Sequence, residues 1–96
     1  MKAVLIIYTS DIDTQIMIAL KQAGITNYSK WESIVGVGSS GAKLGTAIGP
    51  GTNKMLFLLL AEEKIEELLP RFENLKKSFL EKQGLKIVVL PVEKVI

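Results

Sequence analysis

Three short runs of this chain are apolar at almost every position, and this lack of alternation limits the folds that the chain can adopt. The runs are residues 2–8, 54–61 and 86–90. A strand with one face in water alternates apolar and polar side chains, whereas these runs place apolar side chains on both faces. The pattern therefore predicts β-strands that are shielded from water on both sides.

Two segments between the apolar runs have the 3.6-residue spacing of amphipathic helices. The first runs from about 11 to 23 and is followed by Gly24, a residue typical of helix ends. The second runs from about 62 to 82, with glutamates near its start and lysines near its end, which suits the helix dipole. Pro70 lies inside the second segment, where it removes a backbone hydrogen bond, so we expect a kink or a break near residues 66–69.

A fourth strand is expected at residues 28–35, where apolar and charged residues are mixed as in an edge strand. The element order is then β-α-β-β-α-β. Right-handed crossovers fold this order into an α+β, ferredoxin-like βαββαβ unit, with a four-stranded antiparallel sheet and two helices on one face. We predict a single domain over residues 1–96 with a flexible glycine-rich loop at about 36–53.

The second face of such a sheet has no helix to cover it, yet the strands are apolar on both faces. An exposed apolar sheet of this size is an association surface. We therefore expect a homo-oligomer in which the open faces pack together. The alternative is that the C-terminal residues 92–96, or the long loop, fold over the open face.

The composition excludes several classes of chemistry. The chain has no cysteine and no histidine, which removes disulfides, thiolate nucleophiles, serine–histidine triads and the usual zinc ligands. A formal charge of +2 lacks the basic excess of a nucleic-acid-binding domain. The only arginine, Arg71, falls in the second helix, whereas an acylphosphatase-like enzyme would need an arginine loop near the first strand. We expect no enzymatic activity, no metal site and no nucleic-acid partner.

The first apolar run bears on the location of the protein. It is far shorter than a membrane span and lacks the small-residue cleavage site of a leader peptide. We expect a cytoplasmic protein without membrane insertion.

The glycine-rich segment at residues 36–53 is the strongest candidate for a ligand site. Its length exceeds the ~12–15 residues beyond which a connection is usually functional or disordered. Backbone N–H groups at glycines, hydroxyl donors and lysines together suit a phosphate or a carboxylate. The candidate ligand-binding residues here are Gly36, Val37, Gly38, Ser39, Ser40, Gly41 and Lys43, followed by Lys54.

Two nucleotide-binding motifs are only partly present in this segment. Three glycines at 36, 38 and 41 have the spacing of a dinucleotide-binding turn, but no helix follows them. In a P-loop, Lys43 would stand one place earlier and a hydroxyl would replace Leu44. A loop that becomes ordered on ligand binding fits the residues better, and a mobile connection without a ligand remains the alternative.

Three stretches, in order along the chain, carry a family resemblance. They are Ala19–Thr26 at the end of the first helix, Gly36–Gly38 at the start of the loop, and Val89–Val95 at the last strand. Together they resemble the PII signal-transduction family and its PII-like relatives. The resemblance implies a homotrimer that binds an adenine nucleotide, ATP or ADP, between subunits and contacts a partner protein, an enzyme or a membrane transporter, through the long T-loop.

The same resemblance adds ligand-binding candidates and marks two departures. Thr26 matches the helix end, Gly84 lies in a shortened form of the phosphate-binding B-loop, and Lys86 follows it. Serines and a glycine at 39–41 replace the arginine, glutamine and lysine of nitrogen-regulatory members. We predict a minimal, non-enzymatic PII-like regulator with no obligatory cofactor. A ligand-free oligomeric interaction module is the alternative.

Overall fold

The computed structural model describes residues 1–35, 37–38, 41–42, 53–78 and 84–96. The long strands are β1 (Lys2–Thr9), β2 (Ser29–Ile34), β5 (Asn53–Leu60) and β6 (Leu85–Pro91). The helices are α1 (Asp13–Gln22), which follows the 3-10 turn η1 (Ser10–Ile12), and α2 (Glu62–Ser78). Two short strands, β3 (Val37–Gly38) and β4 (Gly41–Ala42), pair with each other.

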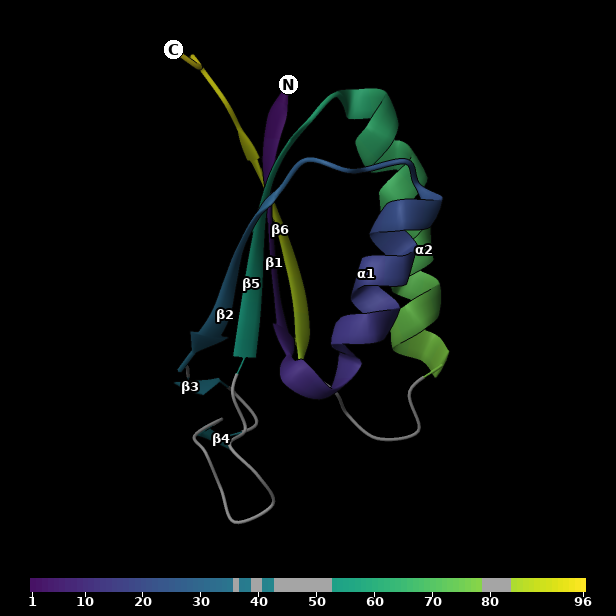
Figure 1. The fold of residues 1–96 in the computed structure, drawn as a ribbon. Helices are drawn as coiled ribbons and strands as arrows, with labels where there is room; N and C mark the ends of the chain where they lie inside the picture. Colours follow the sequence, from purple (N-terminus) through teal and green to yellow (C-terminus); the bar gives the residue numbers. More distant parts are fainter. Residues whose placement is uncertain (36, 39–40, 43–52, 79–83) are drawn as a thin grey trace.

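In the described part of the chain, the long strands form a four-stranded antiparallel sheet in the order β2-β5-β1-β6. β1 and β5 therefore lie at the centre, and β2 and β6 form the edges. Both helices lie on the same face of the sheet (Figure 1). The ferredoxin-like βαββαβ arrangement predicted from the element order is confirmed.

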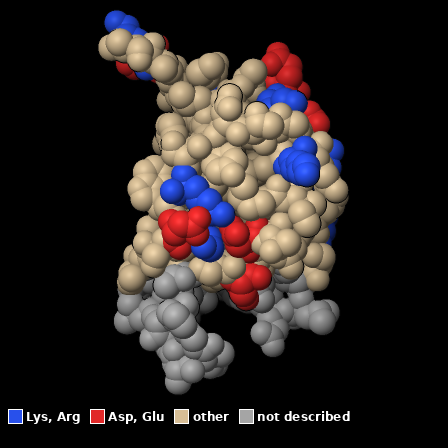
Figure 2. Space-filling view, in the orientation of Figure 1, with Lys and Arg blue, Asp and Glu red and all other residues tan. Residues whose placement is uncertain are grey.

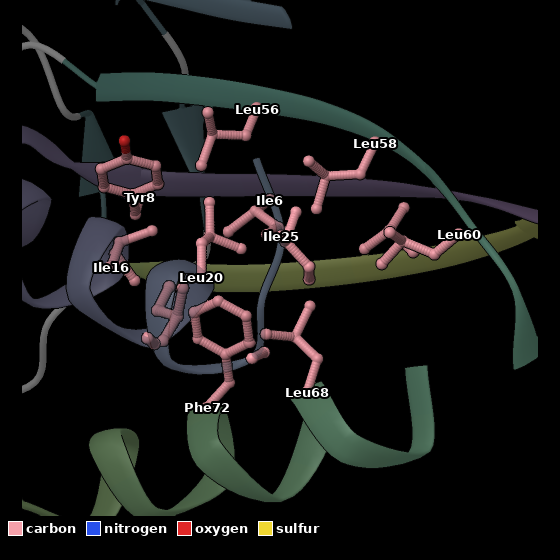
Figure 3. Close-up of a cluster of buried hydrophobic side chains, with 14 of the residues drawn as sticks. Ile6, Tyr8, Ile16, Leu20, Ile25, Leu56, Leu58, Leu60, Leu68 and Phe72 are labelled. Carbon is pink, nitrogen blue, oxygen red and sulfur yellow. The ribbon is translucent and has the colours of Figure 1, made fainter. Parts of the chain in front are cut away.

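The core lies between the helices and the sheet face that they cover. Alternate residues of the central strands point into this layer and meet one side of each helix (Figure 3). The side chains with almost no exposed surface are Val4, Ile6, Tyr8, Ile16, Leu20, Leu56, Leu58, Leu68 and Phe72. Burial of each large aliphatic or aromatic side chain contributes about 1.5–3 kcal/mol to folding, so this layer is the main source of stability.

The end of α1 shows how local sequence sets the path of the chain. Gly24 has a φ of +75°, a conformation that glycine adopts without steric cost. The Gly24 N–H donates to the Lys21 carbonyl at 3.0 Å, and the Ile25 N–H donates to the Leu20 carbonyl at 2.9 Å. These two bonds form a Schellman motif, which ends the helix and sends Ile25 into the core.

Helix α2 continues through Pro70, so of the two expected outcomes, a kink or a break, the break is wrong. Pro70 and Glu66, whose carbonyl loses its helical partner, both lie on the exposed side of the helix. Water can solvate that carbonyl, which lowers the cost of the missing hydrogen bond. The buried residues Leu68 and Phe72 hold the helix to the core on both sides of the proline.

The second face of the sheet is apolar and lies on the side away from both helices (Figure 1). The strand register places mostly apolar side chains on this face: Ala3, Leu5, Ile7, Trp31, Met55, Phe57, Leu59, Val88 and Leu90. The polar residues Ser29 and Lys86 lie on the same face, on the edge strands β2 and β6. Trp31, Leu59 and Leu90 are exposed. The absence of alternation in the sequence thus corresponds to an apolar surface that neither helix covers.

The C-terminal residues do not cover this apolar face. Residues 93–96 are exposed and extend beyond the end of the sheet (Figure 1). The alternative in which residues 92–96 fold over the open face is therefore wrong. The other alternative, a cover formed by the long loop, falls mostly outside the described residues.

Candidate functional site

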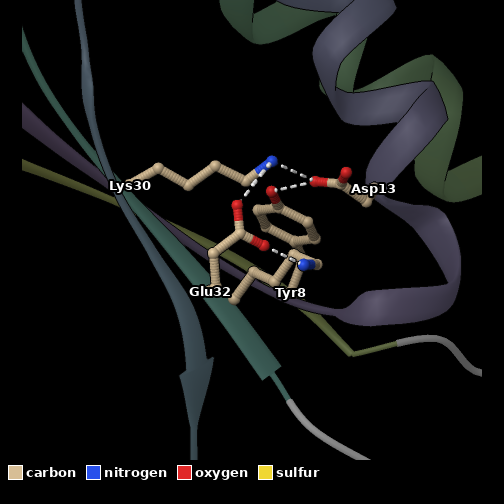
Figure 4. Close-up of polar contacts among 5 residues, drawn as sticks. Tyr8, Asp13, Lys30 and Glu32 are labelled. Atoms are coloured by element: carbon tan, nitrogen blue, oxygen red, sulfur yellow. Dashed lines mark hydrogen bonds and ion pairs between the residues drawn. The ribbon is translucent and has the colours of Figure 1, made fainter.

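A network of five side chains lies where β2 ends and β5 begins (Figure 4). The Tyr8 hydroxyl donates a hydrogen bond of 2.6 Å to Asp13 Oδ1. Lys30 Nζ lies 2.8 Å from the same oxygen and 3.8 Å from Glu32 Oε1. Lys54 Nζ pairs with the other carboxylate oxygen of Glu32. The network thus joins strand β1, helix α1 and the two neighbouring strands β2 and β5.

The sheet register explains why these side chains meet. Tyr8 lies opposite Lys54 in the β1–β5 pair, and Lys30 lies opposite Leu56 in the β2–β5 pair. Opposite residues share a face, so Lys30 and Lys54 point to the side of the sheet that carries the helices. Asp13 is the first residue of α1, where the helix dipole favours a negative charge.

Burial and charge set the protonation states of the network. Burial and the hydrogen bond to Asp13 raise the pKa of Tyr8 far above its ordinary value, so the phenol stays protonated. Burial opposes ionisation of Asp13, but hydrogen bonds from Lys30 and Tyr8 outweigh it and lower the pKa of Asp13. The hydrogen bond from Lys54 lowers the pKa of Glu32.

Lys30 keeps its positive charge in this environment. Burial disfavours the ammonium, but the hydrogen bond to Asp13 and the charge of Glu32 outweigh it and raise the pKa of Lys30. The Lys30 ammonium and the carboxylates of Asp13 and Glu32 therefore face one another as charged species at neutral pH. Figure 2 shows a compact group of lysines and acidic residues bordered by uncharged residues, toward the end of the sheet that carries this network, with other charged groups elsewhere on the same view.

The candidate ligand residues are only partly described. Gly36, Ser39, Ser40 and Lys43 lie outside the described residues. Val37, Gly38 and Gly41 belong to the β3–β4 pair, of which the backbone alone is described.

Among the remaining candidates, Lys54 and Gly84 lie at the same end of the sheet. The Thr9 N–H donates to the Gly84 carbonyl at 2.9 Å, and Thr9 lies opposite Asn53 on β5. A Cβ at Gly84 would lie 3.1 Å from the Thr9 methyl carbon, so this glycine permits a close approach between β6 and β1. Lys54 Nζ forms an ion pair with Glu32 in this chain, and its role toward a ligand stays a prediction.

Thr26 and Lys86 lie apart from Lys54 within one protomer. Thr26 belongs to the segment between α1 and β2, at the opposite end of the sheet from β3 and β4 (Figure 1). Lys86 lies opposite Ile7 and points to the open apolar face, whereas Lys54 points to the helix side. Within a single chain, the candidate residues that the structure describes do not come together in one site.

Sequence reasoning misses most of the network. The sequence pattern assigns Asp13 only to the helix start and Tyr8 only to a strand, while Lys30 and Glu32 fit the charges of an edge strand. A lysine and a glutamate two places apart on one strand are the only local sign, because alternate residues share a face. Their partners come from segments far away in the sequence.

A shallow groove lies between the two helices on the side away from the sheet. It has a volume of about 400 Å³ and is lined by Gln15, Ile18, Ala19, Gln22, Arg71, Asn74 and Leu75. Arg71 Nη1 donates to Gln22 Oε1 at 3.2 Å, so the guanidinium bridges the helices. This contact gives the arginine a structural role in the helix layer.

The described residues contain neither a cluster of metal-binding side chains nor a membrane-spanning helix. No three histidine, cysteine or acidic side chains come together there as potential metal ligands. No helix among them has the length and apolar character needed to span a bilayer.

The described residues thus define a ferredoxin-like α+β protein with one uncovered apolar sheet face and a charged network at one end of the sheet. The chain belongs to the nitrogen regulatory protein P-II family, whose sequence profile matches residues 1–96. This result confirms the resemblance seen in the sequence. No curated protein matches the chain in sequence.

Solved structures show the same fold. CPII, a nitrogen regulatory PII-like protein from Thiomonas intermedia K12 bound to ADP, AMP and bicarbonate, has a TM-score of 0.73 and 20% identity, with 93% of this chain and 88% of that chain covered. The apo form of CPII has a TM-score of 0.65 and 16% identity, with 95% of this chain and 89% of that chain covered. A PII-like signaling protein from Thermus thermophilus has a TM-score of 0.58 and 18% identity, with 92% and 82% covered.

Proposed function

We propose that this P-II family member is a non-enzymatic sensor that binds an adenine nucleotide between the subunits of a homotrimer. The observation that carries the proposal is the family match over the whole of residues 1–96. Its structural neighbour CPII, bound to ADP, AMP and bicarbonate, supports the choice of ligand. The binding signal passes to a partner protein, an enzyme or a membrane transporter.

The uncovered sheet face supports the oligomer. Its central side chains, among them Leu5, Ile7 and Phe57, form a continuous apolar surface across three strands. A monomer would leave this surface in water, whereas packing against other copies removes it from water and stabilises the assembly. Trp31 extends the surface to the β2 edge with 46% of its area exposed.

The spacing of the candidate residues favours a site shared between protomers. Thr26 and Lys54 lie toward opposite ends of the sheet, so one small ligand cannot touch both within a protomer. In the proposed trimer, a neighbouring copy would bring its Thr26 toward the end of the first chain that carries Gly84. The glycine-rich residues 36–41 with Lys43 would supply N–H and hydroxyl donors to the phosphates.

Residues 36–53 are proposed to transmit the signal. They connect β2 to β5 next to the charged network, so a ligand bound there can order the segment and change the surface offered to a partner. Glycines in such a segment raise the entropy cost of ordering, which favours a conditional rather than a permanent structure.

Titration calorimetry with ADP, ATP and AMP, combined with analytical ultracentrifugation, tests this function. We expect a trimer that binds at least one of these nucleotides. A stable monomer, or a trimer that gives no heat with all three nucleotides, would contradict the proposal.

The second candidate is a ligand-free oligomeric interaction module. It is favoured by one observation, the pairing of Lys54 with Glu32 inside the chain. Limited proteolysis of residues 36–53 with and without ADP separates the two functions. Protection by ADP supports the sensor, and an identical cleavage rate supports the module.

A further inference from the structure

The side chains of the charged network differ in how much of their surface is exposed to solvent. Glu32 has 68% of its side chain exposed, whereas the side chains of Lys30 and Lys54 are each only 17% exposed. Glu32 therefore lies outermost, with its two carboxylate oxygens directed at the ammonium groups of two largely buried lysine side chains (Figure 4). The position that Glu32 fills has the chemistry of a small oxyanion site.

The two lysines differ in what they would retain without Glu32. Lys30 Nζ lies 2.8 Å from Asp13 Oδ1, so it keeps a carboxylate partner. Among the described residues, the ion pairs of Lys54 involve Glu32 alone. The network is neutral with Glu32 in place and carries one positive charge without it.

We infer that Glu32 is an internal competitor for a small-oxyanion site formed by Lys54 and Lys30, and that a phosphate or carboxylate group of a ligand displaces it. The inference rests on the proposed function, because it assigns the anion of that ligand to this end of the sheet. The incoming oxygens accept the hydrogen bonds that the Glu32 carboxylate accepts in the free protein.

The local structure keeps the free-energy cost of displacing Glu32 low. β2 is an edge strand, and its register with β5 is irregular between Trp31 and Ile34, the stretch that contains Glu32. Glu32 is the exposed partner, so water solvates its carboxylate when the side chain turns outward, and an ion pair of this kind is weak. Glu32 can therefore turn outward without disturbing the core.

Displacement would also change how two strands are held together. Glu32 lies on β2, which precedes residues 36–52, and Lys54 lies on β5, which follows them. Their ion pair links the two ends of this segment. A ligand that captures Lys54 removes the link, which couples anion binding to the segment proposed to contact the partner.

The test compares phosphate binding by the full-length wild-type chain with that of four variants. Nuclear magnetic resonance titrations with inorganic phosphate, at constant ionic strength set with chloride, give the dissociation constants. We expect Glu32→Gln and Glu32→Ala to bind phosphate about threefold to fivefold more tightly, the gain that follows from removing a weak competing ion pair. The double variant Glu32→Gln/Lys54→Gln should lose that gain.

The matched control is Glu73→Gln, which removes an exposed carboxylate from α2 and changes the net charge equally. It should bind phosphate as the wild type does. Equal affinity of wild type and both Glu32 variants would overturn the inference, as would an equal gain in Glu73→Gln or a gain that persists in the double variant.

Calorimetry with ADP on the same proteins separates this inference from the proposed function. Tighter phosphate binding by the Glu32 variants without any ADP binding would leave the competitor role standing and remove the nucleotide sensor. ADP binding by the wild type without any phosphate gain in the Glu32 variants would do the reverse.

Discussion

Replacing Tyr8 by phenylalanine isolates one hydrogen bond of the charged network. The ring is 1% exposed and packs in the core, so Tyr8→Phe keeps the packing and removes only the hydroxyl, which donates to Asp13 at 2.6 Å. A hydrogen bond to a charged group contributes about 1.5–3 kcal/mol. Asp13 keeps Lys30 and has 29% of its side chain exposed, so water can replace part of the lost donor. We therefore expect a loss near the low end, about 1.5 kcal/mol.

This loss should depend on pH through Asp13. Its pKa is lower in the folded protein than in the unfolded chain, so the stabilisation is present above the unfolded value and disappears as pH falls through the folded value. At pH 7 the full cost of Tyr8→Phe is expected. Below the folded pKa, Asp13 is neutral and the cost should fall to about 1 kcal/mol, the central value for a neutral hydrogen bond.

Urea unfolding followed by circular dichroism, at one fixed protein concentration, measures both effects. Tyr28→Phe is the matched control, because Tyr28 is 44% exposed and its change should cost less than about 0.5 kcal/mol. This account of the network is wrong if Tyr8→Phe is as stable as the wild type at pH 7, or if the loss of stability caused by Tyr8→Phe does not change in acid.

Three further predictions concern the open face and the helices. Phe57→Glu places a charge on the open sheet face and should dissociate the oligomer, whereas Ile18→Glu, on the exposed side of α1, should leave it intact. Sedimentation velocity measures the oligomeric state of both variants. An intact oligomer of Phe57→Glu would exclude this face as the interface. Gly24→Ala should cost about 1–2 kcal/mol in urea unfolding because φ is +75°, and an unchanged midpoint would contradict the left-handed helix end. Pro70→Ala should increase the free energy of unfolding by up to about 3 kcal/mol, because alanine restores a helical hydrogen bond. A lower melting temperature of this variant would contradict the prediction and mean that the proline stabilises the protein.

The fold was largely predictable because its signals are local. Apolar runs and 3.6-residue spacing lie within single segments, so the element order and the uncovered apolar face followed from them. The prediction of a break at Pro70 was wrong because the cost of a proline inside a helix depends on whether water reaches the Glu66 carbonyl. The burial of that carbonyl is a property of the folded chain.

The site was less predictable than the fold. Lys54 was identified as a cation near the loop, but its pairing with Glu32 was not, since 22 residues separate the two. Tyr8 and Lys30 were also missed as partners of Asp13. Such contacts depend on strand register, and a shift of one residue would turn each side chain to the other face.

By itself, the sequence determined where the four long strands and the two helices form and that the sheet is mostly apolar on both sides, because these properties depend on the order of side chains within each segment. Only the tertiary structure decided that Glu32 engages Lys54 and that Tyr8 meets Asp13. The physical reason is that an ion pair or a hydrogen bond requires two groups a few ångströms apart, and only the packing of β1, β2, β5 and α1 brings these groups to that distance.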